Sequence, residues 1–245
     1  MKKLNICMAA LLLVLAGCGG NSNNTSAPEP FATPPPPPEV TFTYEVTAVN
    51  VTNAQPFSHL AVILHTQDFS TFSVGDSASV ELEMLAESGD NSALLAMADG
   101  QDSVFSTASG AGIIMPGMRE TVTISTTGVA PLDLQLTVLT MPVNTNDAFT
   151  GGNSINLNDL ETGESMMFRG LAYDAGTEVH TESASDIPGP VAGGEGFNAI
   201  RDDRQDVITM HAGVLTSDDG LIGSVLTNQH RFLNPVGSFR ILRTE

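Results

Sequence analysis

Alternating apolar and polar positions dominate the chain from about residue 40 onward. The alternating apolar positions are Phe42, Tyr44 and Val46, then Val122 and Ile124, then Leu132, Leu134, Leu136 and Val138, and finally Phe239 and Ile241. Clusters of Gly, Asn, Asp and Pro separate these segments. A period of two between turn signals is typical of antiparallel strands with one buried face. Residues 40–245 are therefore predicted to form one all-β domain.

One segment, 76–98, departs from this pattern. It is rich in Ala, Glu, Leu and Met, which favours a helix that Asp76 or Ser77 would cap and Gly89 would end. A strand remains the alternative, because Val80, Leu82 and Met84 also alternate with polar residues.

A tight turn is predicted near the C-terminus. Asp219-Gly220 stands between Val214 and Leu221, and this dipeptide is typical of a two-residue β-hairpin turn.

The N-terminus has the layout of an export signal. Lys2 and Lys3 precede an apolar run, Met8–Ala16, that is short for a membrane span. The run ends in Leu15-Ala16-Gly17-Cys18, which resembles a bacterial lipobox, so residues 1–17 are predicted to be removed and Cys18 to carry acyl chains such as palmitate. An ordinary signal peptide with a chance cysteine is the alternative. By the rule for such lipoproteins, Gly19 instead of Asp after the cysteine indicates the outer membrane.

Residues 18–39 are predicted to be a disordered tether. Small polar residues come first, and five prolines, Pro34–Pro38, follow. Such a stretch has no means of burying a core, and its proline end favours an extended polyproline II conformation. The tether would hold the domain away from the membrane.

Charge and cysteine content exclude several functions. The chain has 28 acidic and 9 basic residues, a formal charge of −19, and loss of Lys2 and Lys3 would make the mature chain more negative still. A surface of this sign repels nucleic acids and anionic lipids, so membrane attachment is expected through the lipid alone. The two cysteines, Cys7 and Cys18, both precede the domain, which excludes disulfides and thiol chemistry within it.

Several short motifs, taken in order, resemble the spondin N-terminal domain of bacterial spondin-domain lipoproteins, which are related to the animal F-spondin and mindin. The motifs are Val49-Asn50-Val51-Thr52, Gln55-Pro56-Phe57-Ser58, Leu64-His65, Phe72-Ser73-Val74-Gly75, Leu85-Ala86-Glu87-Ser88-Gly89-Asp90, Asn146-Asp147-Ala148-Phe149, Ala172-Tyr173-Asp174-Ala175-Gly176-Thr177-Glu178 and Gly189-Pro190. The resemblance spans most of 41–243 and implies a C2-like antiparallel β-sandwich with one or two short helices.

The resemblance also implies a divalent-cation site, with calcium as the expected ion. Asp147 and Asp174 match metal-binding aspartates of the family, and Glu178 lies in the same oxygen-rich loop as Asp174. The family's third carboxylate has no clean counterpart: Thr123 falls near its position, and Glu120 is the nearest acid. Calcium prefers six to eight oxygen ligands, which these loops offer. The alternative is that Asp147 and Asp174 only form Asx turns at strand ends.

No enzyme motif is present in the sequence. The histidines are His59, His65, His180, His211 and His230, with ligand-like spacing only in the weak His180-Thr181-Glu182. His65 and His211 are expected to be buried structural residues. The pair Met166-Met167 is expected to pack in the core and not to bind copper.

The predicted function is therefore that of a lipid-anchored binding or adhesion module at the outer membrane or cell surface. Its partner would be a protein or glycan, its cation would have a structural or bridging role, and it would not be an enzyme. The alternatives are a metal-free structural envelope protein and a hydrolase with an unrecognised site.

Overall fold

A computed structural model of the chain describes residues 35–130, 132–202 and 205–245. The predicted signal peptide, Cys18 and the first part of the tether (1–34) lie outside these described residues. Contacts divide the chain into Met1–Pro36 and Pro37–Glu245, and every described strand and helix belongs to the second unit. Within the described ranges, no helix is long and apolar enough to cross a membrane.

The described residues of the second unit form nine strands, two short α-helices and two 3₁₀ turns. In chain order these are β1 (Glu39–Asn50), β2 (Ala61–His65), α1 (Val80–Ser88), α2 (Ser92–Asp99), β3 (Val104–Ser109), β4 (Arg119–Val129), β5 (Gln135–Thr140), β6 (Ala148–Asn156), β7 (Ser165–Asp174), β8 (Thr209–Met210), η1 (Ser217–Asp219), η2 (Asn228–His230) and β9 (Gly237–Arg243). The predicted all-β class with one or two short helices is confirmed.

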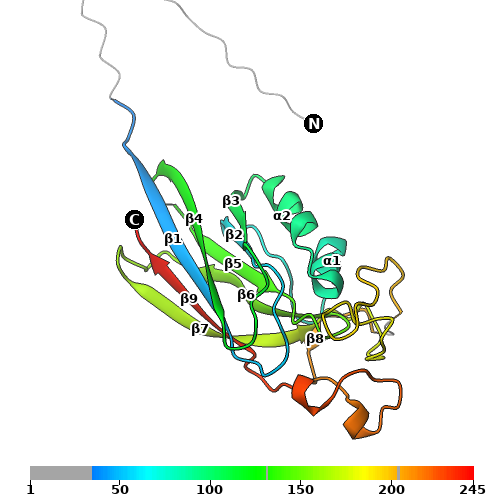
Figure 1. The fold of residues 1–245 in the computed structure, drawn as a ribbon. Helices are drawn as coiled ribbons and strands as arrows, with labels where there is room; N and C mark the ends of the chain where they lie inside the picture. The colour runs from blue at the N-terminus through cyan, green and yellow to red at the C-terminus, as the bar shows by residue number, and fades with distance from the viewer. Residues whose placement is uncertain (1–34, 131, 203–204) are drawn as a thin grey trace, which may run out of the picture. The chain divides into compact units, whose positions relative to one another are not determined.

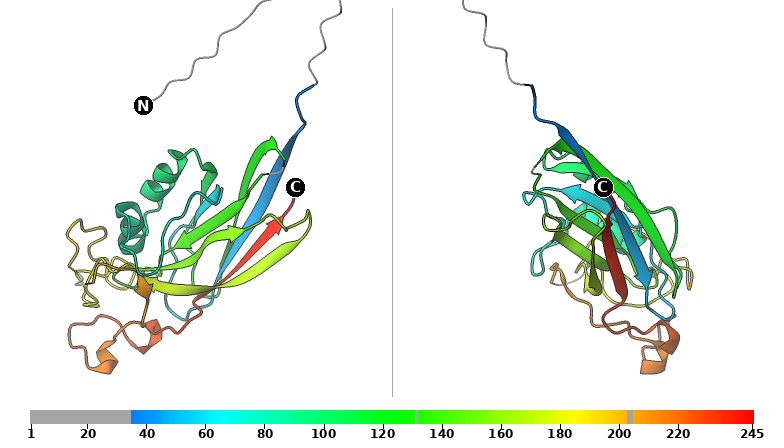
Figure 2. Two further views of the ribbon diagram at one scale, coloured as in Figure 1. Left: turned by 180° about the vertical axis from the view of Figure 1, so that it is seen from behind. Right: turned by 90° about the vertical axis from the view of Figure 1, so that its left-hand side faces the viewer.

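The strands form a sandwich in which one sheet folds back over itself. The strand order is β3-β2-β5-β6-β7-β9-β1-β4, every pair is antiparallel, and β8 pairs with β7. Figures 1 and 2 show the two layers and the long strand β7 that runs between them. The two ends of the order meet, because the Ser106 hydroxyl of β3 donates to the backbone carbonyl of Ser125 in β4 (2.8 Å). The sheet is therefore nearly closed.

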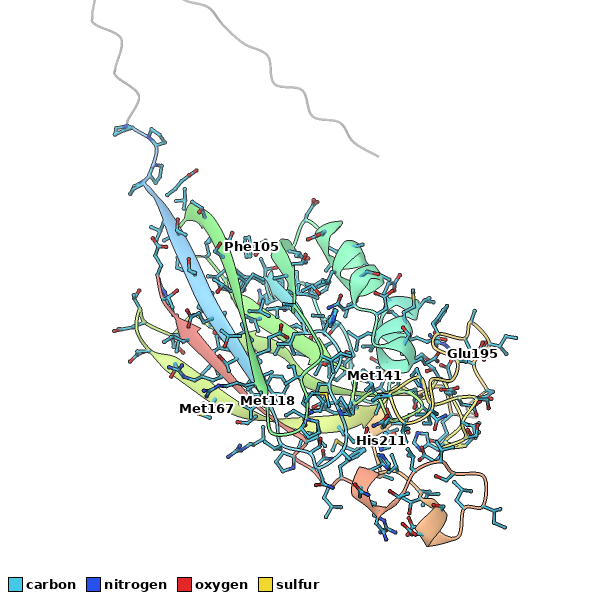
Figure 3. The ribbon with its side chains drawn as sticks, in the orientation of Figure 1. Phe105, Met118, Met141, Met167, Glu195 and His211 are labelled. Carbon is cyan, nitrogen blue, oxygen red and sulfur yellow. The ribbon has the colours of Figure 1, made fainter. Side chains whose placement is uncertain are left out.

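The strand β7 carries the two adjacent methionines, and only one of them packs in the core. Met166 is partly buried against the core, whereas Met167 is 65% exposed and points away from the strands (Figure 3). Successive side chains of a strand point to opposite faces. The prediction that both methionines pack in the core is therefore wrong for Met167.

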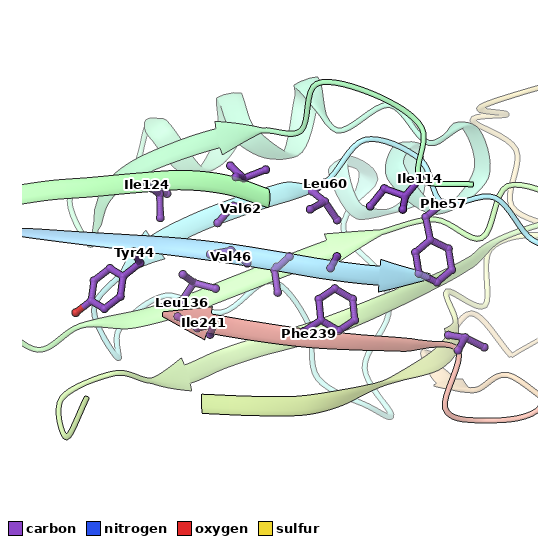
Figure 4. Packing of buried hydrophobic residues seen from close by; sticks show 14 of the residues in the cluster. Tyr44, Val46, Phe57, Leu60, Val62, Ile114, Ile124, Leu136, Phe239 and Ile241 are labelled. Atoms are coloured by element: carbon purple, nitrogen blue, oxygen red, sulfur yellow. The ribbon is translucent and has the colours of Figure 1, made fainter. Parts of the chain in front are cut away.

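The alternation predicted for β1 places its apolar side chains inside the sandwich. Phe42, Tyr44 and Val46 are buried, and Phe239 and Ile241 of the neighbouring β9 point into the same space (Figure 4). Burial of large apolar side chains such as these is the main stabilising contribution to a fold of this size. The predicted inward positions of both strands are confirmed.

The strand β2 is buried on both faces because it lies between two cores. Val62 and Leu64 belong to the core inside the sandwich, and Ala61 and Ile63 belong to a second core. That second core fills the space between the sheet and the helices α1 and α2, which cover this face (Figure 1). A strand covered on both sides is expected to be a continuous apolar run.

The segment predicted as a helix over 76–98 forms two helices instead of one. The Ser79 hydroxyl accepts the backbone N–H of Leu82, so Ser79 and not Asp76 or Ser77 caps α1. Gly89 ends α1 as predicted, in the left-handed conformation (φ 72°). The chain turns at Asp90, whose carboxylate accepts the N–H of Ser92 where α2 begins.

The predicted hairpin turn at Asp219-Gly220 is wrong. Ser217–Asp219 forms a 3₁₀ turn, and Gly220 ends it with φ 93°. The Asp219 carboxylate accepts both the backbone N–H and the hydroxyl of Thr216, which closes the turn on itself. A capping aspartate followed by a left-handed glycine has the same sequence signature as a hairpin turn.

His65 is a buried structural residue, as predicted. Its Nδ1 lies 2.7 Å from the carbonyl oxygen of Thr66 and its Nε2 lies 2.9 Å from the hydroxyl of Thr137. Burial lowers the pKa of His65 below its usual value, although the Thr66 carbonyl and the nearby Asp133 carboxylate oppose this shift. The folded protein therefore disfavours the charged imidazolium.

This burial predicts acid sensitivity. Below about pH 6.5 the unfolded chain binds a proton at His65 that the folded chain resists, so the stabilisation is complete above that pH and is lost as the pH falls toward the lowered folded pKa. Replacing His65 with Asn should reduce the loss of unfolding free energy between pH 7.5 and 5.5, by up to about 1.4 kcal/mol for each pH unit of the shift. Urea unfolding at both pH values measures it. The exposed His59→Asn variant should retain the full loss, and an unchanged loss in His65→Asn would contradict the prediction.

Candidate metal centre

Two aspartates meet where β6 begins and β7 ends. Asp147 immediately precedes β6, Asp174 is the last residue of β7, and the antiparallel register pairs Ala148 with Asp174. Asn50 at the end of β1 pairs with Gly237 of β9, and Gly237 pairs with Gly170 of β7. The end of β7 therefore lies at the end of the sandwich opposite to Glu39, where β1 begins. Figures 1 and 2 show the same separation. The site therefore lies at the far end of the sandwich from the point where the chain enters it.

The loop after β7 wraps around the carboxylate of Asp147. Asp147 is fully buried, and its Oδ2 accepts the backbone N–H groups of Thr177 (2.8 Å) and Glu178 (3.1 Å). The loop turns back sharply at Gly176 (φ 72°), whose N–H donates to the carboxylate of Asp174. One oxygen of Asp147 is thus satisfied by backbone donors, whereas Oδ1 has no hydrogen-bond partner in the described part of the chain.

The imidazole of His180 lies between the two aspartates. Its Nε2 is 3.3 Å from Oδ1 of Asp147 and 3.1 Å from Oδ2 of Asp174. These three donor atoms all lie within 4.8 Å of one another, which is close enough for all three to contact one metal ion. The ring of His180 stacks on that of His211 at a centroid distance of 4.8 Å.

The charges of the site shift the pKa values of its members. Burial alone would lower the pKa of His180, but the carboxylates of Asp147 and Asp174 outweigh it and raise the pKa to about 10. Burial alone would raise the pKa of Asp174, yet His180 and the N–H of Gly176 together lower it. Burial lowers the pKa of His211 to about 4, and the charge of His180 adds to this. The site strongly favours positive charge between the aspartates.

Further acids surround this group. Burial first, and then the carboxylates of Glu87, Asp147 and Asp186, raise the pKa of Glu178 to about 8. Burial also raises the pKa of Glu87, to about 7, and that of Glu182. The chain has no lysine beyond Lys2 and Lys3 that would offset these charges. A bound dication would relieve the cost of burying several carboxylates together.

Buried polar atoms without a hydrogen-bond partner are concentrated here. In the described residues there are seven such side-chain atoms, and four of them belong to Asn146, Asp147, His180 and Glu182. Glu182 is held in place by its other oxygen, Oε1, which accepts the N–H of Leu215 (3.0 Å). Buried polar atoms are normally paired, so a concentration of unpaired ones points to a bound ion or water.

The predicted site residues do not all meet. Asp147 and Asp174 do lie together, and Glu178 contributes its backbone N–H to Asp147. Glu120 lies at the start of β4, where its carboxylate accepts the N–H of Ala111, and it is not in the three-donor group. His180 takes the third place instead. The only sequence signal for it was the weak His180-Thr181-Glu182 spacing.

An open pocket borders the site on the side of His211. It has a volume of about 470 Å³ and is lined by 212–214 and 231–233. His211 contacts it through the ring of Phe232, at a centroid distance of 5.3 Å, and Figure 3 shows His211 at this end of the sandwich. Leu233, which is 87% exposed, lies on the rim.

The molecule is therefore an all-β sandwich whose loops at one end bring together two aspartates and a histidine. The Spondin_N family model matches residues 47–188, which is more than half of the chain and includes Asp147, Asp174 and His180. The chain therefore belongs to the spondin N-terminal domain family. No curated protein matches the chain. Family membership implies an extracellular binding or adhesion module at most, without naming a partner.

Proposed function

We propose that this protein is a lipid-anchored binding or adhesion module of the cell envelope, whose far end is organised by a divalent cation. Asp147 carries the proposal: a fully buried carboxylate keeps one oxygen unpaired and directs it toward a second aspartate and a histidine. A buried carboxylate oxygen without a hydrogen-bond partner is costly unless an ion or another ligand compensates it. The cation would hold the loop 174–182 in one conformation and so shape the surface offered to a partner.

The arrangement of the chain suits attachment at one end and binding at the other. The lipobox-like Leu15-Ala16-Gly17-Cys18 and the proline-rich stretch precede β1, and the site lies at the opposite end of the sandwich. We propose that the protein resides at the outer membrane or cell surface and binds a protein or glycan there. The pocket beside His211 would form one part of the contact surface.

Calcium is the ion that the family resemblance implies for this site. Asp147, Asp174 and Glu178 would supply carboxylate oxygens, and neighbouring backbone carbonyls would supply others. The cation would neutralise buried carboxylates and link β6 to the loop that follows β7.

One observation favours a second candidate function, that of a metal-free structural envelope protein. A protonated His180 would itself neutralise Asp147 and Asp174, because its Nε2 lies within 3.3 Å of both carboxylates. In that case the loop would be ordered without any added ion.

The two candidates differ in their response to metal. We expect calcium, manganese or zinc, added singly to the metal-stripped full-length protein in detergent, to raise its melting temperature. A ligand at 100 times its dissociation constant stabilises the folded state by about 2.7 kcal/mol. The Asp147→Asn variant keeps an acceptor for the N–H groups of Thr177 and Glu178 but loses the charge, so the shift should disappear. Differential scanning calorimetry measures both.

An exposed acid provides the control for this experiment. Asp159→Asn removes the same charge from an exposed turn after β6 and should leave the metal-induced shift intact. If none of the three ions changes the melting temperature of the unsubstituted protein, the cation-organised module is wrong and the metal-free candidate stands.

A further inference from the structure

The third donor atom of the site is a ring nitrogen of His180, and its chemistry determines which metal ions the site prefers. Besides two carboxylate oxygens, the group contains Nε2 of His180. Calcium is a hard cation that takes oxygen ligands almost exclusively. Imidazole nitrogen suits zinc and the neighbouring transition metals, which also accept carboxylate oxygen. The donor set therefore differs from the all-oxygen set that calcium requires.

His180 forms ion pairs with both aspartates, but well-formed hydrogen bonds do not fix its position. A ring nitrogen carries at most one proton, yet Nε2 lies 3.3 Å from one carboxylate and 3.1 Å from the other. Despite these distances, within the described residues neither Nε2 nor Oδ1 of Asp147 has a partner that meets hydrogen-bond geometry. An ion pair with well-formed hydrogen bonds would direct the N–H at one oxygen.

Two of the three donor separations match those of ligands around a small dication, and all three lie within 4.8 Å. Zinc binds histidine nitrogen and carboxylate oxygen at about 2.0 to 2.2 Å, so two ligands of a tetrahedral zinc lie roughly 3.3 Å apart. The two distances from Nε2 agree with this value. Calcium bonds are longer, at about 2.3 to 2.6 Å, and this ion prefers oxygen ligands alone.

Neighbouring groups hold the three donors in place. Backbone N–H groups fix Oδ2 of Asp147 and leave Oδ1 directed at the site, and the ring of His180 is stacked on His211 at an interplanar angle of 20°. The Nδ1 of His211 accepts the N–H of Gly213 (2.9 Å), which fixes the orientation of the second ring. Outer contacts of this kind orient the ligands of known metal sites.

We propose that the site binds a transition-metal dication of the zinc class, in preference to calcium, through Oδ1 of Asp147, Oδ2 of Asp174 and Nε2 of His180. This inference rests on the proposed cation-organised function and specifies its ion. A fourth coordination position is left for water or for a donor atom of a bound partner. Glu182 is also buried, interacts electrostatically with His180 and Asp147, and keeps one oxygen without a hydrogen-bond partner.

Titration calorimetry with zinc alone and with calcium alone tests the proposal on the metal-stripped full-length protein in detergent. We expect one zinc ion per chain and an affinity at least about 100-fold tighter than that for calcium. The His180→Asn variant should lose at least about 100-fold in zinc affinity, since loss of outer contacts alone costs 10- to 100-fold. Its calcium affinity should change little. The control His59→Asn removes an exposed histidine and should bind zinc as the unsubstituted protein does.

The outcomes separate this inference from the proposed function. If calcium binds as tightly as zinc, or if His180→Asn binds zinc unchanged, the inference is wrong while the cation-organised module stands. If neither zinc nor calcium binds, both are wrong. The ranking of zinc and calcium on the unsubstituted protein decides the question even if a variant fails to fold.

Discussion

Replacing Arg201 with methionine is expected to lower the free energy of unfolding by about 3 kcal/mol, because removing one partner of a buried ion pair leaves the other charge uncompensated. The partner is Glu83 of α1, whose side chain is 2% exposed. Both Nε (2.8 Å) and Nη2 (2.6 Å) of Arg201 donate to one oxygen of Glu83. Methionine preserves much of the aliphatic length, so the lost charge and its hydrogen bonds dominate the effect.

The environment of Glu83 makes the loss severe. Glu87 lies one helical turn further along α1 and is also buried, so without Arg201 two carboxylates would face each other across one turn. Arg201 additionally donates to the carbonyl of Ala78 and to Asp206, and so connects α1 to the segment that leads to β8. The substitution should therefore loosen this segment as well as α1.

Urea unfolding at pH 7 measures the effect, with Arg240→Met as the matched control. Arg240 is an exposed arginine of β9, and its replacement should cost less than about 0.5 kcal/mol. Adding Glu83→Gln to Arg201→Met should restore part of the lost stability, because the uncompensated charge is removed. A loss in Arg201→Met no greater than in Arg240→Met would show that the ion pair contributes nothing.

Strand positions could be predicted from the sequence because they depend on local alternation. Phe42, Tyr44 and Val46 face inward for the same reason that their neighbours face outward: side chains alternate along a strand. The strand partners were not predictable in this way. The pairing of β1 with both β9 and β4 joins segments about 200 and 80 residues apart, and no local pattern specifies it.

The candidate site shows the same division. Asp147 and Asp174 were expected from the family resemblance, and the antiparallel pairing of β6 with β7 brings them together. His180 was missed as a third donor because its position depends on a loop held by backbone N–H groups on Asp147. Glu120 was expected only as the acid nearest to the position of the family's third carboxylate, and in the structure it accepts the N–H of Ala111 on another loop.

Replacing Gly176 with alanine should lower the free energy of unfolding by about 2 to 5 kcal/mol and should weaken metal binding together with it. Two costs add. The left-handed backbone (φ 72°) disfavours any residue with a Cβ by about 1 to 2 kcal/mol. A Cβ at this position would also lie 2.4 Å from the carbonyl oxygen of Val207. The backbone shift needed to remove this clash costs about 1 to 3 kcal/mol more.

The displaced backbone is the one that holds the site. Gly176 donates to Asp174, and the next two N–H groups fix Asp147, so a shift at 176 moves both aspartates relative to His180. Gly163→Ala is the matched control: its φ of 87° carries the same backbone strain, but nothing lies within 4 Å of the added Cβ. It should cost about 1 to 2 kcal/mol and leave metal affinity unchanged. Equal losses in the two variants, measured by urea unfolding and zinc titration, would mean that the contact with Val207 does not constrain the loop, and the preorganised site proposed here would lose its main structural support.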